Sequence, residues 1–501
     1  MQTEESAAVT GPAWTSSRSG TYPGRFPLSV ERHTMNLVDR LVPGVTTVTL
    51  NARYYALHGL VASEVDRRGL NLAAAQNLLR RAEVTIGAVS TRHYQRNPAA
   101  HEALSRPHAY DTILPQVRAG QVDLDRLAAP QVYAQPNWGF WPAYRGSEML
   151  LRIVTRTNEI GPGERLDQSA VQAGLRDVLE LLDEKTLDVD LLDAYEELCV
   201  CRAVDSPDGA WLARLLAASG TDADGTRAAV RRQTLRMIAR CLQLTEVYQV
   251  STDVSQFVAY APESFEDRVL TSLDLTAEWR GLILRNHSVA AWRGLWAWLV
   301  NGMSGLTTRS QFTDRFAEAL PDVAVADFLA GLPHTSTPAG RAAPAEHDPD
   351  LDAAATPVRC LGVLCLGARR AMELRGRELH GFQGHDPEDI FEELAPAWLA
   401  AQLDRWKPRS LRDFARWLAE VMLNRSQRLA LAKARRDPRS GTLKIPTRVH
   451  TRDEFVFRDS VESSGGAALR WDQLAGILAG AGLLSRVDGV WTLGPRGDLI
   501  V

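Results

Sequence analysis

The sequence predicts a mainly α protein, with multi-helical N-terminal and middle regions and a small C-terminal winged-helix-like α+β domain. Three observations support this fold class. From Val30 onward, apolar residues recur mostly three or four positions apart, and few stretches alternate between apolar and polar residues. Gly, Pro, Ser and Asp interrupt this pattern where helices are expected to end. Only beyond residue 467 does a helical pattern lead into two short β-prone runs.

The composition indicates an ordinary globular protein with more than one domain. The chain has 501 residues, of which 45% are hydrophobic and 24% charged, as is typical of proteins that pack a core. A chain of this length exceeds a single compact core. We expect a flexible tail at 1–24, a helical domain with room for two subdomains at 25–332, a linker at 333–350, a helical domain with a basic helix at 351–440 and the winged-helix-like domain at 441–501.

Helical periodicity and end signals predict the individual helices. In the first domain, Leu and Ala residues in 57–61 and 72–82 recur at helical spacing. Further helices are expected at 168–183, 189–203, 209–218, 225–245, 265–284, 289–303, 310–331, 351–376, 387–405 and 411–436. The last of these begins with Ser410 and Asp413, a pair that resembles a capping box. The stretch 333–350 lacks large apolar residues, which favours a linker.

The C-terminal module combines a helix with a hairpin. Residues 467–482 have a helical pattern that ends at Gly482, where a left-handed residue is favoured. Asp488-Gly489 then separates two short β-prone runs, and this dipeptide is a strong hairpin signal. The combination is typical of the second half of a winged helix. Arg470 and Arg486 are its candidate DNA contacts, although a module that binds protein rather than DNA remains an alternative.

A basic segment at 405–452 is the strongest functional signal. It contains fourteen basic and three acidic residues, whereas the whole chain has a net charge of −4. Concentrated positive charge favours contact with a phosphate backbone. With the two arginines of the C-terminal module, the candidate nucleic-acid-binding residues are Arg412, Arg416, Arg425, Arg428, Lys433, Arg435, Arg436, Arg439, Lys444, Arg448, Arg470 and Arg486. The alternative is a solvated helix face, or one that docks onto acidic parts of the same chain.

No familiar catalytic motif occurs in the sequence. Phosphate-binding loops, dinucleotide fingerprints, nucleophile elbows and the His-Glu-x-x-His signature are all absent. Cys199 and Cys201 stand too close together for a zinc knuckle, and Cys360 and Cys365 lack histidines at finger spacing. Buried thiols explain these cysteines, so the sequence predicts neither a metal site nor a cofactor. The acidic stretch after His385 is explained by helix capping.

A polar site in the N-terminal region is a second candidate. Five of the eleven histidines fall within the first 108 residues, among arginines and tyrosines. The residues that would form this site are Arg53, Tyr54, His58, Arg92 and His93. The alternative is a set of amphipathic helices with ordinary surface histidines and core tyrosines.

The sequence favours a cytoplasmic protein. Its five cysteines form no disulfide pattern, and its first thirty residues do not resemble a secretion signal. The most apolar stretches, 289–300 and 358–366, are shorter than the ~20 apolar residues that a bilayer-spanning helix needs. We therefore expect no membrane association.

The segment from Pro43 to Tyr55 resembles one found in uncharacterised bacterial proteins that are often encoded in phage-defence gene neighbourhoods. It has a Pro-Gly turn, the pair Thr46-Thr47 and an Ala-Arg-Tyr sequence that opens a helix. The resemblance implies a defence role without assigning chemistry. The leading hypothesis is a non-enzymatic DNA-associating or scaffolding subunit of a multiprotein anti-phage system, with DNA and other defence proteins as partners. Two alternatives stay open: a nuclease-type enzyme that uses N-terminal His and acidic residues, and an adaptor that recruits a helicase or nuclease.

Overall fold

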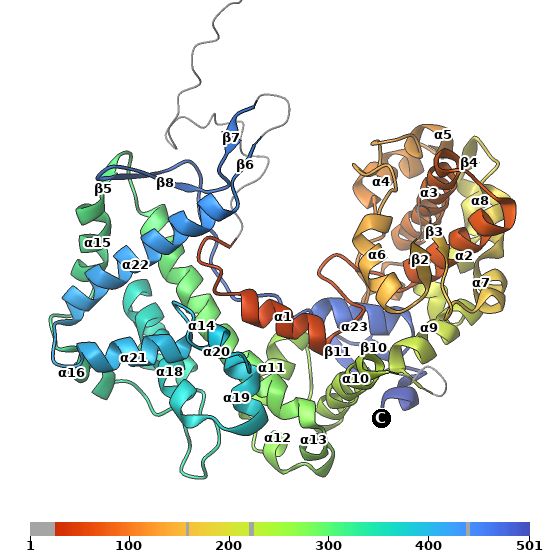
Figure 1. Cartoon of the computed structure of the whole chain (residues 1–501). Helices are drawn as coiled ribbons and strands as arrows, with labels where there is room; N and C mark the ends of the chain where they lie inside the picture. Colours follow the sequence, from red (N-terminus) through yellow and green to blue (C-terminus); the bar gives the residue numbers. More distant parts are fainter. Residues whose placement is uncertain (1–25, 157–159, 220–224, 437–440) are drawn as a thin grey trace, which may run out of the picture. The chain divides into compact units, whose positions relative to one another are not determined.

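The chain is mainly helical, as the sequence predicts, with a few short antiparallel strand pairs (Figure 1). The structure is a computed structural model that describes residues 26–156, 160–219, 225–436 and 441–501. It divides into two compact units, each built from two stretches of chain. Unit 1 comprises Met1–Leu37 and Ala277–Ala467, and unit 2 comprises Val38–Thr276 and Ala468–Val501. The boundaries fall within α1 (Arg32–Leu41) and α14 (Asp274–Asn301) and just before the C-terminal helix.

This division differs from the one expected from the sequence. The expected tail at 1–24 lies outside the described residues. The stretch 333–350 belongs to unit 1, where the buried Arg370 binds its backbone. The guanidinium donates to the carbonyls of Thr335 and Ala343 and forms an ion pair with Glu346. Residues 441–501 do not form one domain either, because 441–467 belong to unit 1 and 468–501 to unit 2.

Unit 2 contains six of the eleven strands in the described part of the chain, and the C-terminal module. Its elements are α2 (Arg53–Arg68), α3 (Leu72–Arg96), η3 (Pro98–His101), α4 (Tyr110–Arg118), β1 (Gln121–Asp123), α5 (Leu124–Leu127), α6 (Trp141–Leu150), β2 (Val154–Arg156), β3 (Ile160–Pro162), α7 (Gln168–Leu181), β4 (Thr186–Asp188), α8 (Val189–Ala194), η4 (Glu196–Leu198), η5 (Val200–Val204), α9 (Pro207–Ala217), α10 (Thr226–Leu244), η7 (Val250–Val254), α11 (Ser255–Tyr260), α12 (Glu263–Glu266), α13 (Arg268–Ser272), α23 (Trp471–Gly480), β10 (Leu484–Val487), β11 (Val490–Leu493) and η9 (Gly497–Ile500).

Two helices, α2 and α3, organise unit 2. α2 ends at Gly69, whose φ of 59° is left-handed and whose N–H donates to carbonyls of the last turn. Two residues later the side chain of Asn71 caps α3 by accepting from the N–H of Ala74. α2 packs against α3 and α7, and α3 packs against α4. Nearly every residue of α2 from Arg53 to Val65 is buried, so its polar side chains need internal partners.

The C-terminal module has the helix and hairpin that the sequence predicts. β10 pairs with β11, and both turn residues, Asp488 and Gly489, have positive φ. The module is not an isolated domain, because α23 packs within unit 2. A Cβ at Gly480 would lie 3.2 Å from Cβ of Ala52, directly before α2. The backbone of α23 therefore lies close to the start of α2.

Unit 1 is a helical assembly with a small sheet. Its elements, besides most of α14, are β5 (Thr307–Thr308), α15 (Arg309–Glu318), α16 (Val325–Ala330), η8 (Ala345–His347), α17 (Pro349–Ala353), α18 (Thr356–Glu373), α19 (Gly376–Gln383), α20 (Pro387–Ile390), α21 (Pro396–Trp406), α22 (Leu411–Ala432), β6 (Arg435–Arg436), β7 (Leu443–Lys444), β8 (Val449–Arg452) and β9 (Phe455–Arg458). The strand order of the sheet is β5-β9-β8.

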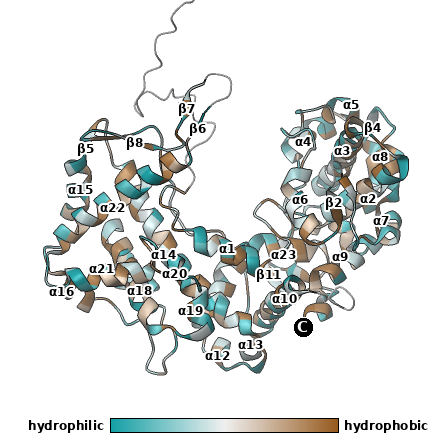
Figure 2. Ribbon diagram, in the orientation of Figure 1, coloured by the Kyte–Doolittle hydropathy of each residue, from teal (hydrophilic) through white to brown (hydrophobic). Residues whose placement is uncertain are grey.

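The core of unit 1 forms around α14, α18 and α22. Hydrophobic residues alternate with hydrophilic ones along these helices (Figure 2), and Trp292, Trp296, Leu364, Phe414 and Leu418 all belong to one buried cluster. α22 packs against α15, and α18 packs against α21. The side chain of Ser410 caps α22, as the sequence predicts.

α14 corrects one expectation, because the two helices predicted at 265–284 and 289–303 are largely one. The polar residues between them do not end the helix, because their side chains contact other segments of unit 1. The side chain of Asn286 donates to the carbonyl of Ala467 and accepts from its N–H. Ser288 packs closely against Gly367, where a Cβ would lie only 2.2 Å from the Ser288 hydroxyl oxygen. Among the described residues, no helix is both long enough and apolar enough to cross a membrane.

Candidate nucleic-acid surface and buried polar centres

The basic segment 405–452 divides into two parts in the structure. In the first part, arginines of α22 bind carboxylates and carbonyls of unit 1. Arg416 binds Asp314 at 2.6 Å, and Arg412 donates to the carbonyl of Leu320. Arg425 is only 6% exposed and binds Glu392 at 2.6 Å. These side chains hold unit 1 together, as the docking alternative anticipated.

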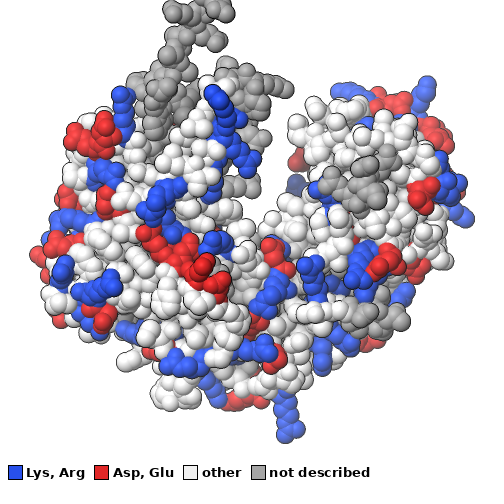
Figure 3. All heavy atoms as spheres, in the orientation of Figure 1, with Lys and Arg blue, Asp and Glu red and all other residues white. Residues whose placement is uncertain are grey.

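The second part is more exposed. It comprises the last turns of α22 and the β6–β7 hairpin, in which Arg435 lies opposite Lys444 and Arg436 opposite Leu443. All four side chains are exposed, as is Arg428, although Arg428 also binds Glu393. Lys433 lies between the helix and the hairpin and donates to the carbonyl of Phe26. Figure 3 shows Lys and Arg side chains gathered over this hairpin.

The remaining candidates for nucleic-acid contact have other surroundings. Arg448 binds the buried Glu462 at 2.9 Å. Arg470 donates to the carbonyl of Val45 and pairs with Asp39, so it is occupied within unit 2. Arg486 donates to the carbonyl of Gly489 in its own hairpin and lies over the Trp491 ring. Arg439 lies outside the described residues.

The five candidates of the N-terminal polar site do not form one site. Arg92 binds Asp193 at a partly exposed position. Tyr54 is fully buried, with its ring 4.7 Å from that of His108. Arg53, His58 and His93 belong to three separate groups of contacts. The structure therefore brings Tyr54 and His58 together, with ring centroids 6.1 Å apart, but does not gather all five residues around one pocket.

Arg53 forms a buried clamp at the start of α2. Its guanidinium makes a bidentate ion pair with Asp208 on α9, at 3.1 and 3.2 Å, and both side chains are fully buried. The same guanidinium donates to the carbonyls of Glu197 and Cys199, at 2.5 and 2.6 Å. A bidentate pair of this kind fixes orientation as well as charge. Arg53 thereby fixes the backbone between η4 and η5.

His58 is the centre of a buried carboxylate network, which we call the His58 centre. Its Nδ1 lies 2.6 Å from Oε1 of Glu148, and its Nε2 lies 2.9 Å from Oε1 of Glu83. The second oxygen of Glu148 accepts from the indole N–H of Trp141. The second oxygen of Glu83 accepts from the hydroxyl of Tyr133 and from a backbone N–H. Each carboxylate oxygen and both ring nitrogens thus have partners.

Electrostatics favour a protonated His58. Burial lowers the pKa of this histidine, but the charges and hydrogen bonds of Glu148 and Glu83 outweigh burial and raise the pKa to about 9. Burial also raises the pKa of Glu148. With His58 and both carboxylates at most 1% exposed, the network is positioned to stabilise the helices around it rather than to meet a substrate.

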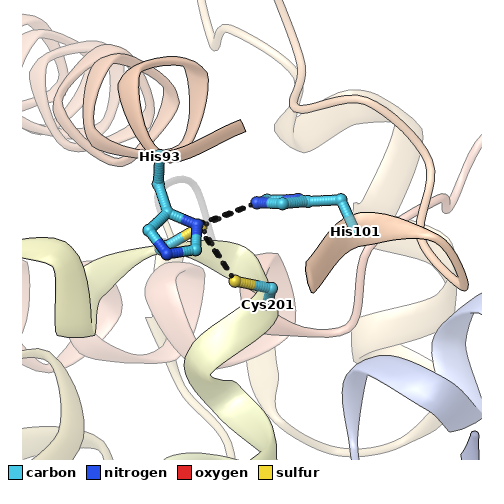
Figure 4. Close-up of side chains that lie close together, drawn as sticks. His93, His101 and Cys201 are labelled. Carbon is cyan, nitrogen blue, oxygen red and sulfur yellow. Dashed lines mark hydrogen bonds between the residues drawn. The ribbon is translucent and has the colours of Figure 1, made fainter. Parts of the chain in front are cut away.

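His93 belongs to a different cluster, which we call the His93 cluster: His93, His101, Cys199 and Cys201. Figure 4 labels three of them, His93, His101 and Cys201. The two imidazoles face each other with Nδ1 of His93 3.0 Å from Nε2 of His101. Sγ of Cys199 lies 3.5 Å from Nε2 of His101, and Sγ of Cys201 lies 3.5 Å from Nδ1 of His93. The two sulfurs are 3.3 Å apart.

Local structure brings these four side chains together. His93 lies in the last turn of α3, and His101 ends the η3 turn that begins at Pro98. Cys199 has extended backbone between two 3-10 turns, with φ of −56° and ψ of 142°. Cys201 lies in the first turn of η5, directly after this extended residue. The Cys-x-Cys spacing, which disfavoured a zinc knuckle, here directs both thiols to one point.

Sequence reasoning missed three of the four members of the His93 cluster as site residues. It compared the cysteines only with ligands nearby in sequence, whereas the histidines stand 98 and 108 positions away. One available signal was the coincidence of a Cys-x-Cys pair with a His pair eight positions apart. Comparison of the chain with protein-family models, curated proteins and solved structures found no match.

Proposed function

We propose that the protein associates with nucleic acid through the end of α22 and the β6–β7 hairpin, as a non-enzymatic subunit of a bacterial anti-phage defence assembly. The observation that carries the nucleic-acid part is the exposed basic hairpin, in which Arg435 and Lys444 stand directly opposite each other. Like charges in opposite positions destabilise a strand pair. This pair of positive charges therefore does not stabilise the hairpin, but it can bind an anion.

The charge balance of the chain around the hairpin supports a phosphate-backbone partner. From Lys433 to Lys444 the sequence has five basic residues and a single acidic one, Asp437. Exposed arginines and lysines release counterions when they neutralise phosphates, which gives binding that depends on salt and tolerates sequence changes. The defence role is supported by the resemblance of Pro43–Tyr55 alone.

The buried groups favour a non-enzymatic role over a nuclease. A hydrolytic enzyme needs its acid, base or metal-binding carboxylates within reach of substrate. The histidine and two glutamates of the His58 centre are excluded from solvent.

Fluorescence anisotropy with the full chain and labelled DNA tests the proposal. The variant R435A/R436A removes two hairpin charges, and R405A/K407A is its matched control, because it removes two exposed charges from the same segment near the end of α21. The affinity decreases with salt, and we expect the slope of log affinity against log salt to become less steep by about 2 in the hairpin variant. The slope of the control should stay unchanged. Absence of binding at low salt, or equal losses in both variants, contradicts the proposal.

A further inference from the structure

We propose that the His93 cluster binds one Zn²⁺ ion, with His93, His101, Cys199 and Cys201 as its four ligands. This inference is independent of the proposed function. The four side chains converge, because one donor atom from each residue lies within 4.8 Å of the donor atoms of the other three. Three of the residues are at most 4% exposed, and Cys201 is 9% exposed.

The separations between donor atoms are close to those of a tetrahedral ion. With zinc–sulfur bonds of about 2.3 Å and zinc–nitrogen bonds of about 2.0–2.1 Å, tetrahedral ligands lie about 3.3–3.8 Å apart. The separations of Cys199 Sγ from His101 Nε2 and of Cys201 Sγ from His93 Nδ1, both 3.5 Å, fall in this range. The nitrogen–nitrogen separation of 3.0 Å and the sulfur–sulfur separation of 3.3 Å are shorter, by about half an ångström or less, than the about 3.4 and 3.8 Å that these bond lengths imply for each pair. Small side-chain rotations therefore suffice to seat the ion.

Ordinary buried thiols have different surroundings in this chain. Cys241, Cys360 and Cys365 are also buried, and burial raises the pKa of each of these thiols. Cys199 instead touches another thiol and an imidazole. Its separation from Cys201 is far longer than the about 2.05 Å of a disulfide bond. The cluster thus has the contacts of a set of metal ligands without a covalent link.

The ligand set selects the metal. Two thiolates and two imidazoles in a tetrahedron favour zinc, whereas harder ions such as Mg²⁺ and Ca²⁺ prefer oxygen ligands. A two-iron cluster with His₂Cys₂ ligation holds its histidines and cysteines on separate irons. The contacts of His101 with Cys199 and of His93 with Cys201 leave no room for a second metal and bridging sulfides. A single zinc ion fits.

The site has the features of structural rather than catalytic zinc. Four protein ligands fill the tetrahedron, whereas catalytic zinc keeps a position for water or substrate. The ion would join the end of α3 and η3 to the η4–η5 segment, about a hundred residues later in the chain. Arg53 holds the η4–η5 segment in place, since it donates to the carbonyl of Cys199 at 2.6 Å. Ser90 on α3 supports it too, since its Oγ accepts from the N–H of Val200. Zinc at this point stabilises the packing of α2, α3 and α9 around it.

Elemental analysis of the full chain, purified without a polyhistidine tag and dialysed against a mild chelator, tests the proposal. We expect about one zinc per chain for a structural site. The variant C199S/C201S should lose the zinc, while the matched variant C241S, which changes a buried thiol of the same unit outside the cluster, should keep it. Zinc retained in C199S/C201S contradicts the proposal.

Cobalt substitution of the unaltered protein supplies a test that does not depend on the folding of a variant. After replacement of zinc by Co²⁺, the proposal predicts the intense visible absorption of tetrahedral cobalt together with a thiolate-to-cobalt charge-transfer band. A weak octahedral spectrum without the charge-transfer band overturns the assignment. So does a preparation that has no zinc and takes up no cobalt.

Discussion

Two buried centres of unit 2 contain the same residue type and differ in what surrounds it. In the His58 centre, two glutamates face the two ring nitrogens, and the remaining carboxylate oxygens accept from Trp141, Tyr133 and the backbone. In the His93 cluster, a second imidazole and two thiols face the ring instead. The hydrogen-bonding atoms of the first centre all have partners within it or in the backbone beside it. The second brings four electron-pair donors to one point.

The difference shows how a buried polar group reveals its role. A group that is fully hydrogen-bonded inside a protein stabilises the fold, because removing any partner leaves another unsatisfied. Thiols and imidazoles satisfy each other poorly by hydrogen bonding, since the thiol is a weak donor and a weak acceptor. Their convergence is better explained by a metal ion, which needs deprotonated donors.

The largest expected effect follows from removing the ion. Structural zinc contributes about 10–16 kcal/mol to the folding of zinc-finger peptides, and in this larger unit we expect chelation to cost about 5 kcal/mol or more. Denaturant unfolding of zinc-loaded and chelator-treated protein, followed by circular dichroism, measures this cost. Added zinc should restore the original midpoint. If unfolding midpoints with and without chelator coincide, the ion does not stabilise unit 2.

Breaking the Arg53 clamp is expected to have the next largest effect. The variant D208A leaves the buried guanidinium without its ion-pair partner, which costs about 3–5 kcal/mol. D193A is the matched control, because Asp193 pairs with Arg92 and Arg96 at partly exposed positions, where solvent screening makes an ion pair weaker than a buried one. Chemical denaturation of both variants gives the comparison. Equal losses would show that the buried pair has no special role.

D208A should also weaken zinc binding, since Arg53 positions the carbonyl of Cys199. Competition with a chromophoric chelator measures this affinity. An unchanged zinc affinity in a folded D208A protein would separate the clamp from the His93 cluster.

The His58 centre should give the chain a dependence of stability on pH. The folded pKa of His58 is raised to about 9, above the unfolded value of about 6.5. The resulting stabilisation is complete below pH ~6.5 and is lost as the pH rises to ~9. We expect H58Q to be less stable than the native chain by about 2 kcal/mol at the lower end of this window. Thermal melting at a series of pH values measures this difference in stability between H58Q and the native chain. The difference should become smaller toward the upper end of the pH window, and a difference that grows with pH would contradict a protonated His58.

H58Q also sharpens the contrast between the two centres. This variant should keep its zinc, whereas H101A should lose it, because His101 belongs to the His93 cluster and His58 does not. Zinc content measured on both variants distinguishes them. If H58Q loses zinc while it remains folded, the two centres are coupled rather than independent.

The sequence predicted what depends on local patterns. Helical periodicity located most helices, Ser410 marked the start of α22, and Asp488-Gly489 marked the C-terminal hairpin, because each of these signals acts within a few residues. The boundaries of the two units depend instead on contacts between distant segments. Nothing near 333–350 indicates that Arg370 binds this stretch, and nothing near Trp471 indicates that α23 packs beside Ala52.

The candidate sites also depend partly on local sequence patterns and partly on contacts between distant segments. Net charge located the basic segment, but only the structure separates arginines such as Arg425, which bind unit 1, from those of the β6–β7 hairpin. The sequence also directed attention to Arg53, His58 and His93, yet it offered no means of grouping them. His101, Cys199 and Cys201 could not be joined to His93, because backbone folding over about a hundred residues brings them together.

X-ray absorption at the zinc edge of the purified full chain tests whether the His93 cluster holds zinc. We expect a four-coordinate ion with two sulfur neighbours at about 2.3 Å and two nitrogen neighbours at about 2.0–2.1 Å. A first shell of oxygen and nitrogen atoms without sulfur would place any bound zinc elsewhere on the protein, and would contradict the assignment of His93, His101, Cys199 and Cys201 as its ligands.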